Sequence, residues 1–207
     1  MIEQLELFAP KNSTQPIHDG PLHKINGLTY VPTYVSIDEQ QTMLESIDAL
    51  PWLDDLRRRV QHFGFRYDYK SRRVDPSMRL GILPSWADAI AHRLHRDGYF
   101  EELPDQAIIN EYQPGQGITP HIDCEPCFGP SIASVSLGSP AAMSFTQCVT
   151  GERVDLLLEV GSLVVLQGEA RYEWKHSIPA RMTDRVGGKI VRRRRRVSAT
   201  FRTVILN

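Results

Sequence analysis

Cysteines, aromatic residues and long apolar runs are scarce in this sequence of 207 residues, and each shortage excludes a class of protein. Three cysteines, Cys124, Cys127 and Cys148, are too few for a disulfide framework, so we expect free thiols in a reducing cytoplasm. No apolar run approaches the roughly 18 to 20 residues that a membrane span requires, and the acidic N-terminus does not resemble a secretion signal. A net charge of −1 argues against a histone-like protein.

Positive charge is concentrated near the C-terminal end. Residues 181–207 contain nine basic residues and one acidic residue, whereas residues 1–180 carry a net charge of −9. This asymmetry indicates a polyanionic partner at one face of the protein, with a solvated strand flank as the alternative.

The hydrophobic pattern changes from helical to extended spacing about halfway along the chain. We expect a flexible tail over residues 1–27 and one domain over residues 28–207, acting as a monomer. A capping box at Ser36 predicts a helix that Pro51 ends, and Ser85 with Asp88 opens a second helix that runs to Gly98. Short strands are expected at 107–112, 131–137, 141–149, 153–160, 162–167 and 197–206. This order predicts an α+β chain whose C-terminal part is a sandwich or jelly roll.

Two histidines and one aspartate could form a metal site. Residues i and i+2 of an extended chain point the same way, so His121 and Asp123 can present an imidazole and a carboxylate to one ion. His176 follows an apolar run, and a neighbouring strand could bring it opposite His121 and Asp123. Such a facial triad leaves positions open on a non-haem Fe(II), while satisfied surface imidazoles are the alternative.

The last predicted strand carries two arginines on one face. Arg196 and Arg202 are six residues apart, and their side chains leave a gap that a five-carbon dicarboxylate could fill. Asn110 and Tyr112, again i and i+2, could add an amide and a phenol from a neighbouring strand. On a purely structural interpretation Arg196 belongs to the solvated arginine run and Tyr112 to the core.

Four segments of the sequence together resemble the AlkB family of Fe(II)/2-oxoglutarate-dependent oxygenases. They are Asn110 to Asp123, Ser134 to Gly138, Gly168 to His176 and Arg196 to Arg202. The resemblance extends over roughly residues 28 to 206 and is greatest to the branch that modifies the wobble uridine of tRNA. It implies a double-stranded β-helix, a jelly-roll relative, with a substrate lid.

The resemblance also implies roles for residues of the site. His121, Asp123 and His176 would hold Fe(II), which acts with O2. Arg196 and Tyr112 would bind the distal carboxylate of 2-oxoglutarate, and Arg202 and Asn110 would secure its metal-chelating end. The chemistry implied is hydroxylation of an alkyl group coupled to formation of succinate and carbon dioxide.

The resemblance to the AlkB family implies that the substrate lid lies near residue 70, where aromatic and basic residues interleave. Tyr67 and Tyr69 are candidates to stack on a flipped base, with Arg66 beside them, although alternating strand residues would look the same. Glu125 would face the iron site if the strand continues past Asp123, and a carboxylate there could accept from the exocyclic amine of adenine or cytosine.

These observations favour an oxidative dealkylase of N-alkylated bases, such as 1-methyladenine and 3-methylcytosine, in DNA and possibly RNA. Hydroxylation of a tRNA wobble uridine is the first alternative, although the zinc site of that branch looks absent. A non-catalytic nucleic-acid or sliding-clamp adaptor is the second, because Gln4–Phe8 is similar to the short peptide by which bacterial proteins dock on the replicative clamp.

Overall fold

The computed structural model describes residues 24–54, 56–186 and 188–206, and in this part of the chain two antiparallel sheets face each other. The larger sheet has the strand order β1-β8-β5-β12-β3-β2 and the smaller has β4-β9-β6-β7, while β10 and β11 form a separate hairpin. The strands are β1 (Leu28–Val31), β2 (Arg59–Phe63), β3 (Gln106–Tyr112), β4 (Ile118–His121), β5 (Phe128–Leu137), β6 (Ala141–Gln147), β7 (Arg153–Leu158), β8 (Leu163–Leu166), β9 (Trp174–Ile178), β10 (Thr183–Val186), β11 (Lys189–Arg192) and β12 (Arg196–Val204).

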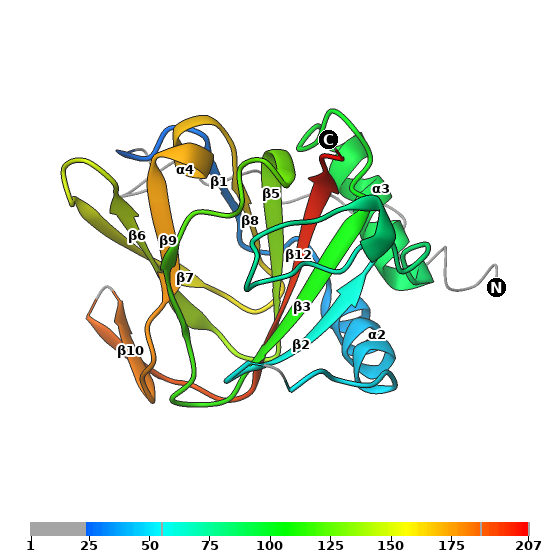
Figure 1. Cartoon of the computed structure of the whole chain (residues 1–207). Helices are drawn as coiled ribbons and strands as arrows, with labels where there is room; N and C mark the ends of the chain where they lie inside the picture. Colours follow the sequence, from blue (N-terminus) through cyan, green and yellow to red (C-terminus); the bar gives the residue numbers. More distant parts are fainter. Residues whose placement is uncertain (1–23, 55, 187, 207) are drawn as a thin grey trace.

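Two α-helices cover the larger sheet on the side away from the smaller one, as Figure 1 shows. The predicted capping box begins α2 (Ile37–Asp48): the Ser36 hydroxyl accepts from the Glu39 backbone N–H, and the Glu39 carboxylate accepts from the Ser36 N–H. Helix α3 (Ser85–Arg96) starts at the predicted residue, but Pro84 is its N-cap and provides no side-chain hydrogen bond. The remaining helical turns are η2 (Pro76–Met78) and α4 (Gly168–Tyr172).

Strict alternation along the central strands separates the core from a cavity. Odd-numbered residues such as Ile109, Val135 and Phe201 pack against α2 and α3. Even-numbered residues of the same strands face the space between the sheets and line a cavity there. Since side chains of successive strand residues point to opposite faces, one sheet builds both environments.

The jelly-roll prediction and all six expected strands are confirmed, with boundaries shifted by up to three residues. Six strands were not predicted. Strand β1 has only four residues, and β2, β4, β9, β10 and β11 carry charged or isolated polar residues that break the apolar alternation. Ile25, which the sequence placed in the tail, is buried between the sheets, so the packed chain begins before residue 28.

The expected clamp-binding segment Gln4–Phe8 lies outside the described residues. Among the described helices, none has the length and apolar character needed to cross a bilayer.

The arginine run is not the continuous solvated patch that the sequence suggested. Arg193 is buried and donates two hydrogen bonds to Asp184, and Arg195 pairs with Asp48 and Glu111. Arg196 is buried between the sheets, so much of the local positive charge is compensated or enclosed.

Candidate active site

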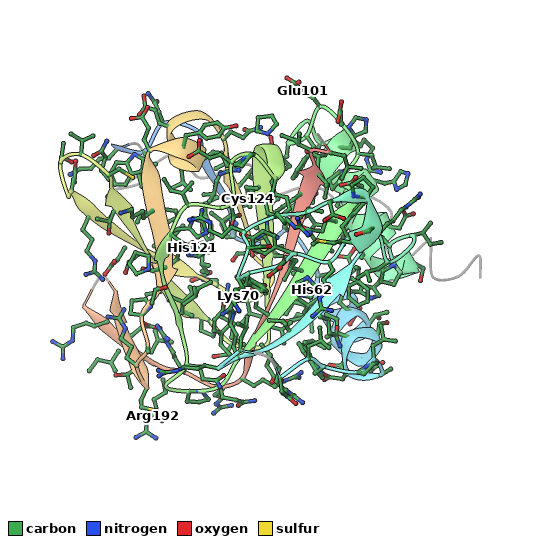
Figure 2. All side chains as sticks on the ribbon, in the orientation of Figure 1. His62, Lys70, Glu101, His121, Cys124 and Arg192 are labelled. Carbon is green, nitrogen blue, oxygen red and sulfur yellow. A yellow bond between two sulfur atoms is a disulfide. The ribbon has the colours of Figure 1, made fainter. Side chains whose placement is uncertain are left out.

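The three expected metal ligands converge between the sheets. His121 ends β4 and lies directly opposite His176 of the neighbouring strand β9, with the ring centroids 4.4 Å apart. Asp123 follows β4 by two residues, and one ligand atom from each of the three side chains lies within 4.8 Å of the others. In Figure 2, His121 lies near the middle of the view and Arg192 at its lower edge.

Hydrogen bonding orients the first imidazole. The Nδ1 of His121 lies 2.8 Å from the carbonyl oxygen of Thr119, which can only accept, so Nδ1 carries the proton. The other ring nitrogen, Nε2, faces Asp123 and lies 3.7 Å from its Oδ1. A neighbouring carbonyl that fixes the tautomer in this way is typical of histidines that bind metals.

Electrostatic interactions also favour the metal-binding protonation states of Asp123 and His176. Burial by itself raises the pKa of Asp123, but the Arg202 guanidinium and the two imidazoles outweigh it, so the pKa of Asp123 lies below its ordinary value. Burial, with a further contribution from His121, lowers the pKa of His176 to about 3. At neutral pH Asp123 is therefore a carboxylate and His176 a neutral imidazole, which are the forms that bind a divalent cation.

A cavity of about 370 Å³ extends from these residues along the inner face of the larger sheet. Arg196 lies in it, buried and stacked 5.4 Å from the centre of the Tyr112 ring, its cross-strand partner. Its Nη2 donates to the Ser136 hydroxyl at 3.0 Å, whereas its buried Nε has no hydrogen-bond partner.

No described carboxylate forms an ion pair with Arg196, and burial lowers the pKa of its guanidinium. A buried cation without a counter-ion is costly, so this end of the cavity fits an anionic ligand such as a carboxylate.

The other two expected co-substrate residues also reach the cavity, but each already has a protein partner. Arg202 donates from Nε to Asp123 at 3.2 Å, and the Asn110 side-chain oxygen accepts from Arg58 Nε at 2.8 Å. Arg58 was not identified from the sequence. Its guanidinium lies 5.7 Å from the centre of the Tyr69 ring and 6.0 Å from that of the Tyr112 ring, so Arg58 lines the cavity in addition to Arg196 and Arg202.

The lid segment, residues 66–74, borders the mouth of this cavity. Tyr67 and Tyr69 both line it, in edge-to-face contact with their ring centroids 4.9 Å apart, and Tyr67 is 5.4 Å from Phe128. Arg66 is exposed and borders a neighbouring surface depression instead.

The expected position of Glu125 is wrong. Strand β4 ends at His121, and Glu125 lies in a turn, where it is exposed and is not among the residues that line the cavity. The i, i+2 argument fails here because it requires the strand to continue past Asp123.

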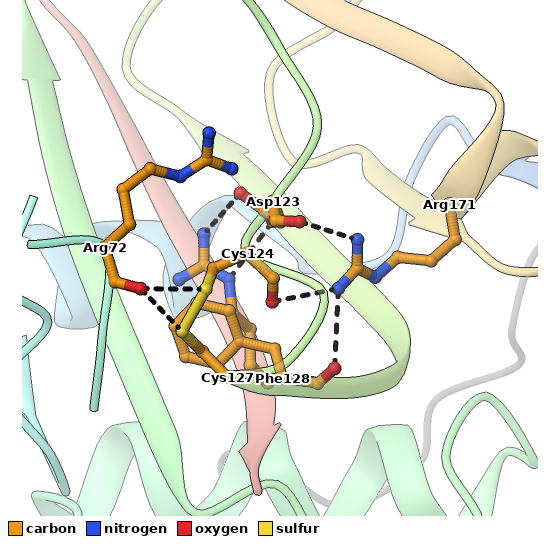
Figure 3. The surroundings of a disulfide bond; sticks show 7 residues. Arg72, Asp123, Cys124, Cys127, Phe128 and Arg171 are labelled. Atoms are coloured by element: carbon orange, nitrogen blue, oxygen red, sulfur yellow. Dashed lines mark hydrogen bonds and ion pairs between the residues drawn. A yellow bond between two sulfur atoms is a disulfide. The ribbon is translucent and has the colours of Figure 1, made fainter. Parts of the chain in front are cut away.

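The expectation of free thiols is also wrong for two of the three cysteines. The same turn brings the Cα atoms of Cys124 and Cys127 to 5.3 Å, and their sulfurs form a disulfide, while Cys148 is free and exposed. The buried Arg171 of α4 fixes this turn by donating to the carbonyl oxygens of Asp123, Cys124 and Phe128 (Figure 3).

Comparison with known proteins agrees with this geometry. The profile of the 2OG-Fe(II) oxygenase superfamily matches residues 52–202. The chain belongs to this superfamily.

Its relatives include AlkB-like proteins. It is 36% identical over 206 residues to the "Alkylated DNA repair protein ALKBH8 homolog" of Arabidopsis thaliana, covering 87% of this chain and 59% of that protein. It is 39% identical over 171 residues to the "tRNA (carboxymethyluridine(34)-5-O)-methyltransferase ALKBH8" of Macaca fascicularis, covering 77% of this chain but 25% of that protein. The chain therefore spans only part of the length of these two relatives.

A solved structure shows the same fold. OsALKBH1 superposes with a TM-score of 0.63 over 91% of this chain and 100% of that one, at 16% identity. The superfamily match and the AlkB-like relatives together identify the chain as an AlkB-like dioxygenase that uses Fe(II), 2-oxoglutarate and O2.

Proposed function

We propose that this oxygenase removes N-alkyl groups from nucleic-acid bases, with His121, Asp123 and His176 as the iron ligands. The observation that carries this proposal is the convergence of that triad, a buried arginine without a counter-ion and an aromatic lid on one cavity. When bound, Fe(II) and O2 supply the oxidation that converts 2-oxoglutarate to succinate and carbon dioxide and hydroxylates the alkyl group.

In this proposal Arg196 and Tyr112 bind the distal carboxylate of 2-oxoglutarate. The free Nε and the adjacent Nη2 of Arg196 suit a two-pronged hydrogen bond to a carboxylate, which would also neutralise the buried cation. Asn110 and Arg202 lie toward the metal end, where Arg202 holds Asp123 in place.

The lid segment supplies the features that a flipped base requires. The rings of Tyr67, Tyr69 and Phe128 offer apolar faces at the cavity, and Arg58 and Arg72 add positive charge to its lining. Aromatic faces stack on bases irrespective of sequence, and guanidinium groups attract the phosphate backbone. An N-hydroxymethyl group left on a base then departs as formaldehyde.

A modified uridine of tRNA is the second candidate substrate. It is favoured by the 39% identity to a relative whose name specifies carboxymethyluridine 34 of tRNA, although that name describes a methyltransferase four times the matched length. Glu125 is exposed in a turn and does not line the cavity, so its position gives no support to adenine or cytosine over uridine.

The decisive assay supplies the protein with Fe(II), 2-oxoglutarate and, in separate reactions, oligonucleotides bearing 1-methyladenine or 3-methylcytosine and tRNA bearing a carboxymethylated wobble uridine. We expect formaldehyde and succinate in equal amounts with a methylated oligonucleotide. Product from the tRNA alone would establish the second candidate instead. Succinate that no nucleic acid stimulates would refute both substrate assignments.

A further inference from the structure

The disulfide next to Asp123 lies against the lid. The sulfur atoms of Cys124 and Cys127 are 3.2 and 3.3 Å from one carbonyl oxygen, that of Arg72 in the lid segment (Figure 3). No other described donor reaches this oxygen. Two cysteines from the metal-binding turn therefore meet the lid at a single acceptor atom.

The backbone at Arg72 has an unfavourable conformation. Its φ of 52° lies in the left-handed region, and among the described residues it is the only non-glycine residue with positive φ. An arginine adopts this conformation only where surrounding contacts hold it. The side chain of the same residue lines the mouth of the cavity, so a change in this contact would alter the entrance.

The oxidation state of the cysteine pair decides whether the Arg72 carbonyl oxygen accepts a hydrogen bond from the turn. A disulfide sulfur carries no hydrogen, so in the oxidised pair the approach to the Arg72 oxygen is only a contact. In the reduced pair each sulfur carries a hydrogen that can be donated to that oxygen.

We propose that Cys124 and Cys127 form a reversible redox site that fastens the lid when reduced and releases it when oxidised. Arg171 keeps its hydrogen bonds to the turn in both states, because it donates to backbone carbonyls and not to sulfur. The position of Asp123, and with it metal binding, is therefore independent of the switch.

Hydrogen peroxide is an oxidant of suitable size. Both cysteines are nearly inaccessible from outside, at 4% and 3% exposure, but Cys124 is among the residues that line the cavity, so in this proposal the oxidant approaches it from there. The Cys124 sulfur attacks one peroxide oxygen, the O–O bond breaks, and a sulfenic acid and water form. The Cys127 sulfur then displaces the hydroxyl group as a second water and closes the disulfide. A dithiol reverses this by thiol–disulfide exchange and is itself oxidised.

Limited proteolysis tests the lid directly and needs no enzymatic activity. Wild-type protein is reduced with dithiothreitol or oxidised with peroxide, and mass spectrometry of the 124–127 peptide confirms the state by the loss of two hydrogens. Trypsin cleavage after Arg72 and Arg73 is then followed over time. A sulfur–hydrogen bond to a carbonyl is weak, worth about a factor of two to five in an equilibrium, so we expect cleavage about two- to fivefold faster in the oxidised protein.

Two variants serve as matched controls. Cys127→Ser keeps a donor for the Arg72 oxygen but cannot form the disulfide, so its lid should be cleaved slowly with or without peroxide. Cys148→Ser removes the exposed free cysteine and should respond as wild type does. Equal cleavage of oxidised and reduced wild type, slower cleavage after oxidation, or a pair that peroxide leaves unoxidised would overturn the proposal.

The consequence for catalysis rests on the proposed function. Oxidation should raise the KM for a methylated oligonucleotide about fivefold, because Tyr67 and Tyr69 belong to the lid, and leave the KM for 2-oxoglutarate unchanged. If the protein acts on no oligonucleotide, the proposed function fails while the proteolysis result still decides the switch. A rise in both KM values would contradict a switch confined to the lid.

Discussion

Replacing Arg196 by methionine should have opposite effects on the free and the ligand-bound protein. Methionine retains an unbranched apolar stem beside Tyr112 but removes a buried cation that has no described carboxylate partner. The lost hydrogen bond to Ser136 costs about 1 kcal/mol, whereas removing an unpaired buried charge is stabilising by a similar amount or more. Without ligand we therefore expect a free energy of unfolding equal to or above that of the wild type.

Binding of 2-oxoglutarate should be strongly weakened in the same variant. Truncating one partner of a buried, hydrogen-bonded charge pair weakens binding by about 2 to 5 kcal/mol or more. For this variant we take about 2.7 kcal/mol, which corresponds to an increase of about a hundredfold in Kd. At a ligand concentration of 100 times the wild-type Kd, the wild type gains about 2.7 kcal/mol and the variant about 0.4 kcal/mol. For a domain of this size the Tm then rises by about 5 to 11 °C in the wild type and by about 1 to 2 °C in Arg196→Met.

Thermal unfolding with Mn(II) in place of Fe(II) measures both effects without turnover. Arg194→Met is the matched control, because Arg194 is exposed and contributes nothing to the cavity lining, so its ligand-induced shift should equal that of the wild type. A full 2-oxoglutarate shift in Arg196→Met, or a loss of several kcal/mol in the free variant, would refute the assignment of this arginine to the co-substrate.

Other changes test the rest of the structure. His176→Ala should abolish Mn(II) binding in a calorimetric titration, since two ligands remain. Asp184→Asn should lower the free energy of unfolding by about 3 to 5 kcal/mol in urea, because Arg193 stays buried without its ion pair, whereas Asp155→Asn at an exposed pair should cost under about 1 kcal/mol. Phe201→Ala, fully buried under the helices, should cost about 3 to 5 kcal/mol by the same measurement. Burial raises the pKa of Asp184, but hydrogen bonds from Arg193, the Ala142 N–H and Arg181 outweigh it, so the pKa in the folded protein lies below the ordinary value of 3.8. The Asp184 carboxylate therefore stabilises the fold fully above pH 3.8. In an acid titration this stabilisation should disappear as the pH falls through the pKa of Asp184 in the folded protein.

Much of the site could be predicted because it depends on strand geometry. Asn110 and Tyr112, and Arg196 and Arg202, share the cavity face of β3 and β12, as their even spacing requires. Where the chain leaves the strand, the same reasoning fails, and Glu125 is the example, because the turn after Asp123 directs it outward.

The alternation of the central strands, the cap of α2 and the types of side chain available for a metal and a dicarboxylate could all be predicted from the sequence. Each depends on residues a few positions apart, and short-range backbone geometry fixes their relation. The folded chain was needed to show that His176 lies opposite His121, that Arg58 reaches Asn110, and that two cysteines meet the lid. Those neighbours are 52 or more residues apart in the chain, and it is the pairing of strands and the packing of loops over the cavity that brings them together.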